Sequence, residues 1–358
     1  MTTTRVLIAE DSATVCELLR AIIGADSRFE VVGVATNGVE AVQMARALKP
    51  DVISMDIEMP LMDGFEATRE IMSVAPTPIV IVSSHYDVRQ VTVSMQALSV
   101  GALAVHPKPL GHDDPDFTKK SADFLRILYT MSQVRVVRHT RRRGAPIPPV
   151  SRIRPASGKC RAVAITISTG GPAALRDMFQ TLPVNYPVPV LVVQHISHGF
   201  VEGLATWLNA VSTVRVKVAV QGEQLQPRTV YLAPDDLHLG VTADGERIYL
   251  ADEPPIKGFR PSGTYLFESV SKAFGASVVG VIMTGMGDDG VVGLRAIHAA
   301  GGAIIAQDEG SSVVFGMPAR AIDAGLADVV LPLTAIVAQL TKQIVNGGVP
   351  ASPDDAHG

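Results

Sequence analysis

The sequence predicts two α/β domains, each built around a parallel β-sheet. Three observations support this fold class. The chain has 358 residues, which is more than one typical domain and enough for two cores. Short apolar runs alternate with amphipathic stretches, as in repeated βα units. A segment near the middle is rich in proline and glycine. We expect an N-terminal flavodoxin-like domain with a five-stranded parallel sheet, followed by a doubly wound, mostly parallel α/β domain.

The first domain is predicted from five apolar runs separated by helical patterns. Strands are expected at residues 5–9, 30–35, 52–55, 79–82 and 102–105. Amphipathic helices are expected at residues 13–23, 38–47, 64–74, 88–100 and 116–131. Five strands joined by crossover helices form a flavodoxin-like sheet, in which ligands bind at the carboxyl ends of the strands.

The segment after the first domain differs sharply in charge. Residues 124–161 carry 10 basic and no acidic side chains, whereas residues 1–123 carry 10 basic and 17 acidic ones. This pattern suits either contact with nucleic acid or a membrane surface, or a solvated linker between acidic domains. No aromatic stacking platform accompanies the charges, so we favour a linker and expect no nucleic-acid binding. The predicted boundaries are a first domain at 1–130, a linker at 131–158, a second domain at 159–346 and a disordered tail at 347–358.

The second domain repeats the βα pattern with different motifs. A hairpin is expected near residues 239–250, and a helix begins near residue 173. Strands are expected at residues 162–167, 188–193, 229–233, 248–250, 278–283, 303–306 and 328–331.

Cysteine usage and hydropathy indicate the compartment. Cys16 and Cys160 are the two cysteines, too few for a disulfide framework or a zinc site. Acidic residues follow the N-terminus too early for a signal peptide, and no apolar run reaches the length of a membrane span. We therefore expect a cytoplasmic protein without membrane insertion, acting as a monomer.

Acidic residues follow two strands of the predicted first sheet. Glu10 and Asp11 come directly after the first strand, and Asp56 follows the third. The carboxyl ends of these strands share one edge, so three carboxylates meet there. Such groups repel one another unless a hard cation lies among them, and Mg²⁺ prefers oxygen ligands. The pattern predicts a magnesium site.

Asp56 is also a candidate nucleophile for phosphoryl transfer. Lys108, just past the fifth strand, would neutralise the transferring group, and the Ser83 hydroxyl at the end of the fourth strand would bond the new phosphate. The alternative is that these polar strand ends are merely solvated loops. Four such residues at one rim, with the turn formers Pro60 and Gly64 after Asp56, favour the functional interpretation.

Ser168 lies where the strand at 162–167 turns into a helix, in the sequence ISTGGP. Its hydroxyl would project beside the free N–H groups and positive end of that helix, which favours an oxyanion. Gly170 and Gly171 allow a tight turn resembling a nucleophile elbow. The alternative is a phosphate cradle, but no Walker lysine or dinucleotide fingerprint accompanies it.

His195 follows the next strand and is the candidate general base for Ser168. A structural role for this histidine is the alternative. His198, three residues further on, is a weaker candidate because it lies deeper in the loop.

The acid that orients the histidine is expected in the loop GMGDDG. Asp288 and Asp289 are both candidates, and the residue types alone do not separate them. Asp235 and Asp236 follow another strand and are rival acids, or they shape the cleft instead.

The first domain resembles the receiver domains of two-component response regulators, through AEDS, MDIEMPLMDG, VSS and KP. The resemblance implies that a histidine kinase phosphorylates Asp56, with Mg²⁺ held by Glu10, Asp11, Asp56 and the backbone carbonyl of Glu58. Two departures are visible. Glu10 stands where the family has Asp, and Val105 replaces an aromatic residue that is usual before the lysine.

The whole chain resembles the chemotaxis protein-glutamate methylesterases. The resemblance rests on the order of ISTGGP, VVQH, VYLAPDDLHLGV, RPSGTYLFESV, TGMGDDG and FGMPARA after a receiver domain. It implies a catalytic triad of Ser168, His195 and Asp289, with backbone donors around Thr169 and Met286 forming the oxyanion hole. It also implies a phosphorylation-regulated hydrolase of glutamate methyl esters on chemoreceptors, with no cofactor for hydrolysis. Related enzymes also deamidate specific glutamines, and one triad could serve both reactions.

One departure from that family lies in the strand before the serine, where Thr166 and Ile167 replace small residues. Two other functions stay open at this point. The protein is alternatively an esterase of a non-chemotactic signalling array, or a phosphorylation-gated binding module with a vestigial triad.

Overall fold

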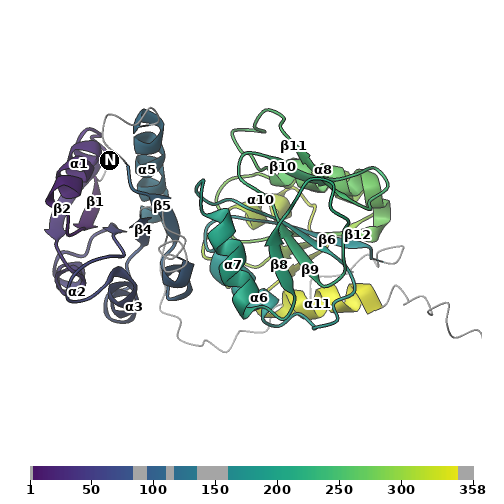
Figure 1. Ribbon diagram of the computed structural model, residues 1–358, viewed down its shortest axis with the longest axis horizontal. Coiled ribbons are helices and arrows are strands. Elements are labelled where there is room, and N and C mark those ends of the chain that lie inside the picture. The colour runs from purple at the N-terminus through teal and green to yellow at the C-terminus, as the bar shows by residue number, and fades with distance from the viewer. Residues whose placement is uncertain (1–2, 84–94, 110–116, 135–159, 346–358) are drawn as a thin grey trace, which may run out of the picture. The chain divides into compact units, whose positions relative to one another are not determined.

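The computed structural model describes residues 3–83, 95–109, 117–134 and 160–345 (Figure 1). It divides into two compact units, Met1–Ile147 and Pro148–Gly358. The predicted linker at 131–158 and the tail at 347–358 lie almost wholly outside the described residues. The domain limits therefore stay predictions.

The first unit is a five-stranded parallel sheet in the order β2-β1-β3-β4-β5, which confirms the predicted flavodoxin-like fold. Helices α1 and α5 lie on one face of the sheet and α2 and α3 on the other (Figure 1). The predicted helix at 88–100 lies partly outside the described residues, and residues 95–99 are helical. The bounds are β1 (Thr4–Ala9), α1 (Ala13–Gly24), β2 (Phe29–Ala35), α2 (Gly38–Leu48), β3 (Val52–Met55), α3 (Gly64–Val74), β4 (Ile79–Ser83), β5 (Ala104–Pro107) and α5 (Phe117–Ser132).

Local sequence explains where these elements begin. Side-chain oxygens of Ser12, Asn37 and Asp63 accept hydrogen bonds from the first turns of α1, α2 and α3, so each helix starts at a capping residue. The strand β5 begins two residues later than predicted, because its register with β4 pairs Val80 with Ala104. Lys108 therefore follows the strand directly.

The second unit is a seven-stranded sheet in the order β14-β13-β12-β6-β7-β9-β8, and all its pairs are parallel. The predicted hairpin is the separate antiparallel pair β10–β11. The edge strand β8 was not predicted, because its four residues alternate charged and apolar types and so form no continuous apolar run. The strands are β6 (Ala162–Ile167), β7 (Val190–Gln194), β8 (Arg215–Val218), β9 (Thr229–Leu232), β10 (His238–Val241), β11 (Ile248–Ala251), β12 (Val278–Ile282), β13 (Ala303–Gln307) and β14 (Val329–Leu331).

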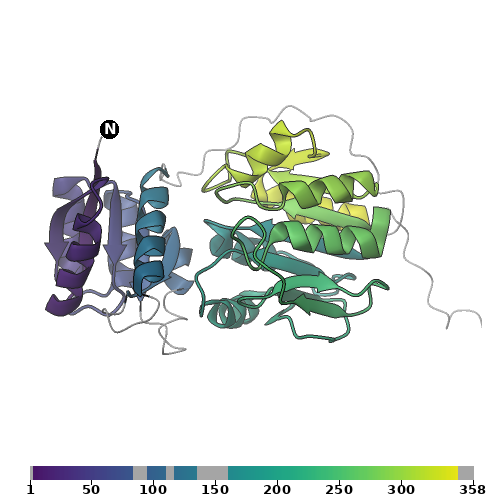
Figure 2. The same ribbon diagram turned by 90° about the horizontal axis from the view of Figure 1, so that it is seen from above.

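Helices cover both faces of the second sheet (Figure 1). Helices α8 and α9 lie side by side, as the two green helices of Figure 2 show. Their buried side chains, including Phe267 and Leu294, join the core against β6 and β12. This packing holds the start of α8 beside the carboxyl edge of the sheet. The helices are α6 (Gly171–Phe179), α7 (Val201–Val211), α8 (Gly263–Phe274), η1 (Gly275–Ser277), α9 (Val291–Ala299), α10 (Met317–Asp323) and α11 (Leu333–Val345).

Each sheet has a topological switch point, where strand order reverses. In the first unit it lies between β1 and β3, and in the second between β6 and β12. Ligands of open α/β sheets bind in the crevice at the carboxyl ends of such strands. Glu10 and Asp56 follow the strands of the first switch point, and Ser168 and Asp289 follow those of the second.

Candidate active and phosphorylation sites

Ser168 directly follows β6, at the turn into α6. Its backbone N–H donates to the Thr284 carbonyl at 3.0 Å, which ties the turn to the end of the neighbouring strand. Gly285 comes next in that neighbouring segment, and a Cβ there would lie 2.6 Å from the Ser168 Cβ. The serine can approach this segment so closely because residue 285 has no side chain.

His195 follows β7 and lies next to Ser168 because the two strands are in register. Ile167 pairs with Gln194, so Ser168 and His195 are the next residues after two adjacent strands. The backbones of adjacent strands are about 5 Å apart. The His195 Nε2 atom is 2.9 Å from Asp289 Oδ2. Its Nδ1 atom is buried and has no hydrogen-bond partner in the described part of the chain. Because Nε2 donates to the carboxylate, we assign Nδ1 as the unprotonated nitrogen.

The Asp289 carboxylate accepts several hydrogen bonds, most of them from residues at the start of α8. Its Oδ1 accepts from the hydroxyls of Ser262 (2.7 Å) and Thr264 (3.0 Å) and from the N–H groups of Thr264 (3.2 Å) and Gly290 (2.9 Å). Its Oδ2 accepts from the Gly263 N–H at 2.6 Å. The positive end of α8 favours an anion at this position.

Burial alone would raise the pKa of Asp289. The hydrogen bond and charge interaction with His195 and the hydrogen bonds from Ser262 and Gly263 outweigh burial, and they lower the pKa to about 2. The residue is only 2% exposed. Asp289 is therefore a fixed, ionised partner for the imidazole at neutral pH.

The other candidate acids, Asp288, Asp235 and Asp236, contact residues other than His195. Asp288 points to Lys257 at 2.6 Å, and both side chains are about half exposed. Asp236 pairs with His198 at 3.0 Å, and Asp235 accepts the Gly199 N–H at 2.8 Å. The two acids after β9 thus contact the loop that follows His195, and their role in shaping a cleft stays a prediction.

The proposed oxyanion donors flank Ser168. Thr169 follows the serine, and its carbonyl accepts from the Thr284 hydroxyl at 2.9 Å. Met286 follows Gly285, and its side chain is 51% exposed. Thr169 precedes α6, and Met286 adjoins the glycine that approaches Ser168, so their role as oxyanion donors stays a prediction.

Several residues around the site were not predicted as functional. Phe259 stacks on the His195 ring, with centroids 4.4 Å apart and planes 17° from parallel. Ser262 and Thr264 bind Asp289, and Gln194 precedes the histidine. The motifs RPSGTYLFESV and VVQH contain three of these residues, but their type alone does not reveal a contact with a segment far along the chain.

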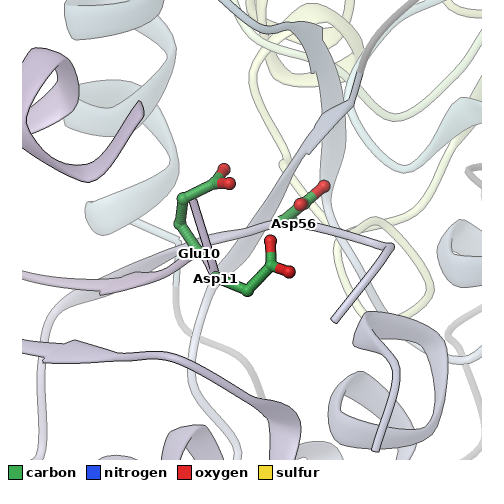
Figure 3. A group of neighbouring side chains, drawn as sticks. All are labelled: Glu10, Asp11 and Asp56. Carbon is green, nitrogen blue, oxygen red and sulfur yellow. The ribbon is translucent and has the colours of Figure 1, made fainter. Parts of the chain in front are cut away.

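In the first unit, the carboxylates of Glu10, Asp11 and Asp56 gather at the edge of the sheet (Figure 3). One ligand atom from each lies within 4.8 Å of those of the others. The Lys108 Nζ atom is 2.7 Å from Asp56 Oδ2 and 3.0 Å from Glu10 Oε2. The predicted cluster, including the lysine, is therefore assembled as a group.

The cluster suits a hard cation. Burial raises the pKa of both Asp56 and Glu10, and the charge of Asp56 raises that of Glu10 further. A divalent cation would relieve this repulsion, and the donors are oxygens of the kind that Mg²⁺ prefers. Asp56 Oδ1 also accepts the Ile57 N–H at 2.7 Å, and a hydrogen bond from the Glu58 backbone stabilises the same carboxylate.

The remaining predicted switch residues lie on neighbouring strands. Ser83 ends β4, and its carbonyl accepts the Lys108 N–H at 3.0 Å. Val105 is buried in β5, so a small aliphatic side chain occupies this position. The next residue, His106, is also buried, and desolvation lowers its pKa to about 4 despite a hydrogen bond to the Pro107 carbonyl.

Among the described residues, no helix combines the length and the apolar character that crossing a membrane requires.

One sheet carries a group of acidic residues at its switch point, and the other carries neighbouring Ser, His and Asp residues. These two sites define a class of protein: a hydrolase joined to a phosphoacceptor domain. Family comparisons agree with both halves. Residues 6–116 match the response regulator receiver domain, and residues 163–340 match the CheB methylesterase. The chain belongs to the CheB methylesterase family.

Full-length relatives support this membership. The chain is 49% identical to protein-glutamate methylesterase/protein-glutamine glutaminase 4 of Myxococcus xanthus (strain DK1622), over 96% of this chain and 98% of that protein. It is 48% identical to protein-glutamate methylesterase/protein-glutamine glutaminase 3 of Anaeromyxobacter dehalogenans (strain 2CP-C), over 94% and 98%. The crystal structure of the Thermotoga maritima CheB methylesterase catalytic domain matches 51% of this chain and 98% of that chain, with 39% identity and a TM-score of 0.50.

Proposed function

We propose that this chain is a phosphorylation-regulated protein-glutamate methylesterase that acts on the glutamate γ-methyl esters of methyl-accepting chemoreceptors. The observation that carries the proposal is the hydrogen-bonded pair of His195 and the buried Asp289, which lies beside Ser168 at a topological switch point. The names of the relatives, which include both methylesterase and glutaminase, support the same reaction class.

The reaction begins when Ser168 Oγ attacks the ester carbonyl carbon and His195 Nδ1 takes the hydroxyl proton. Asp289 holds Nε2–H and stabilises the imidazolium. Backbone N–H groups around Thr169 and Met286 donate to the oxyanion. The proton on Nδ1 then passes to the leaving methoxide, methanol departs, and an acyl-serine ester remains.

Water completes the cycle. His195 takes a proton from the water as its oxygen attacks the acyl carbon, and the same proton returns to Ser168 Oγ when the acyl bond breaks. The glutamate carboxylate is released. A glutamine carboxamide would follow the same path with ammonia as the leaving group, so one site serves both substrates.

Regulation is assigned to the first unit. The Asp56 carboxylate attacks the phosphoryl group of a phosphohistidine on a sensor kinase, with the kinase histidine as leaving group. Glu10, Asp11, Asp56 and the backbone carbonyl of Glu58 would hold Mg²⁺, which neutralises charge on the transferring phosphoryl group when bound. Lys108 shares this role, and the Ser83 hydroxyl bonds the phosphate.

The test is methanol release from membranes that carry methylated receptors, with and without acetyl phosphate and Mg²⁺. We expect release that rises with the phosphodonor, and ammonia release from receptors with unmodified glutamines. Phosphorylation without any methanol release would contradict the methylesterase proposal and favour a binding module. Hydrolysis of a chromogenic ester without action on methylated receptors would favour a different acyl substrate.

A further inference from the structure

Gln194 carries an inference that goes beyond the triad. It is the last residue of β7, it is 5% exposed, and it directly precedes His195. Its Nε2 donates to the Ser168 carbonyl at 2.9 Å and to the His195 carbonyl at 2.8 Å. One side chain therefore bridges the main chains of the proposed nucleophile and the proposed base.

We propose that Gln194 is a positioning residue that orients an oxyanion donor through the Ser168 peptide unit. This role rests on the proposed hydrolase function. The Ser168 carbonyl and the Thr169 N–H belong to the same planar trans peptide, so they point in opposite directions. A hydrogen bond that fixes the carbonyl also fixes the direction of the N–H group.

The carboxamide is the group that suits this place. Its NH₂ carries two donors in one plane, which matches two carbonyl acceptors on adjacent strand ends. These two acceptors assign the orientation of the amide. An ionised carboxylate would place its oxygen atoms against the two carbonyl oxygens, which are also acceptors. An aliphatic side chain would remove the hydrogen bond that the His195 carbonyl accepts from Gln194.

The first turn of α6 is built around the same side chain. A Cβ at Gly171 would collide with Gln194 Oε1, so residue 171 must lack a side chain for the carboxamide to fit. The Gly171 N–H also donates to the Ser168 carbonyl at 2.8 Å. Two donors therefore restrain this carbonyl, one from the turn itself and one from β7.

Because two donors restrain the Ser168 carbonyl, the loss of the Gln194 hydrogen bond should lower kcat less than the loss of a whole oxyanion donor. Removal of an entire oxyanion donor costs on the order of 100- to 1,000-fold in kcat. Gln194→Met keeps the side-chain length but only loosens the donor, because the Gly171 bond remains. We expect kcat to fall about 10-fold, with KM changed less than twofold, because the oxyanion forms only in the transition state.

The experiment compares Gln194→Met, Gln194→Glu and a matched control, Gln180→Met, on the full-length protein. Gln180 is an exposed glutamine that follows the last residue of α6. The readouts are kcat and KM for methanol release from methylated receptors and for hydrolysis of p-nitrophenyl acetate. Circular dichroism and thermal unfolding check the fold of each variant.

Gln194→Glu provides a readout that a purely structural role would not move. The introduced carboxyl group can donate one hydrogen bond when it is protonated, whereas its ionised form cannot donate. The activity of this variant relative to the unchanged protein should therefore fall as the pH rises through the pKa of the new carboxyl group. This ratio decides the proposal even if Gln194→Met does not fold.

Three results would overturn the inference. They are an unchanged kcat in folded Gln194→Met, a loss confined to KM, and a pH-independent activity ratio for Gln194→Glu. If the protein without substitutions hydrolyses p-nitrophenyl acetate but not methylated receptors, that result would instead contradict the proposed function. The Gln194 variants would still be judged on the chromogenic ester.

Discussion

The exchange Asp289→Asn tests the proposed triad most sharply. The side chain keeps its shape, but one oxygen becomes an NH₂ group. At the Oδ1 position this group would face four donors, and at the Oδ2 position it would face the Gly263 N–H and His195. The second placement conflicts with fewer hydrogen bonds. His195 Nε2 then becomes an acceptor, Nδ1 carries the proton, and the imidazole cannot deprotonate Ser168.

Two magnitudes follow from the structure. Loss of the correct tautomer costs roughly 10,000-fold in kcat in triad enzymes. The pKa of Asp289 falls from 3.8 to about 2 on folding, and this shift corresponds to about 2 kcal/mol of stability at neutral pH. A lowered pKa stabilises the fold above the unfolded value, so this contribution is complete above about pH 4 and is lost as the pH falls towards 2.

The assay is methanol release together with urea unfolding at several pH values, with Asp288→Asn as the control. Asp288 is exposed and contacts Lys257, so its exchange should leave activity within about twofold and stability within about 0.5 kcal/mol. Asp289→Asn should be nearly inactive, and its stability should change less between pH 4 and pH 2. Equal activity losses in the two variants would refute the assignment of the acid.

Three further outcomes are expected. Ser168→Ala should lower methanol release on the order of a millionfold with the fold retained, and near-normal release would exclude Ser168 as the nucleophile. Asp56→Asn should abolish phosphorylation by acetyl phosphate with Mg²⁺ and all stimulation while basal hydrolysis remains; a variant that is still stimulated would place the phosphate elsewhere. Thr166→Val should raise the free energy of unfolding by about 1 kcal/mol in urea titrations, because the buried Thr166 hydroxyl has no partner among the described residues; a lower free energy would mean that the hydroxyl is bonded.

Much of the fold was predictable because its signals are local. Alternating apolar and amphipathic segments indicated both parallel sheets, and the capping residues mark the helix starts within a few positions. The strand β8 was missed because an edge strand needs no continuous apolar run. The start of β5 was misplaced because register depends on the neighbouring strand, and its own residues do not specify it.

The candidate sites show the same division. The sequence by itself determined that Ser168, His195, Asp56 and Lys108 follow strands of parallel sheets, because strand ends are visible as a change from apolar to polar residues. The residue types alone did not separate Asp289 from Asp288; the family resemblance implied Asp289, and the tertiary structure shows that Asp289 contacts His195 while Asp288 contacts Lys257. That choice depends on how the loop after β12 returns to the start of α8.

The contacts that support Asp289 and Ser168 also depend on the tertiary structure. Ser262 reaches Asp289 across 27 residues of sequence, and Gln194 reaches the Ser168 carbonyl across 26. The sequence determined which chemical groups exist and which strand ends carry them. The order β12-β6-β7 decided which groups meet, because adjacency in a parallel sheet is set by crossover connections that no local pattern specifies.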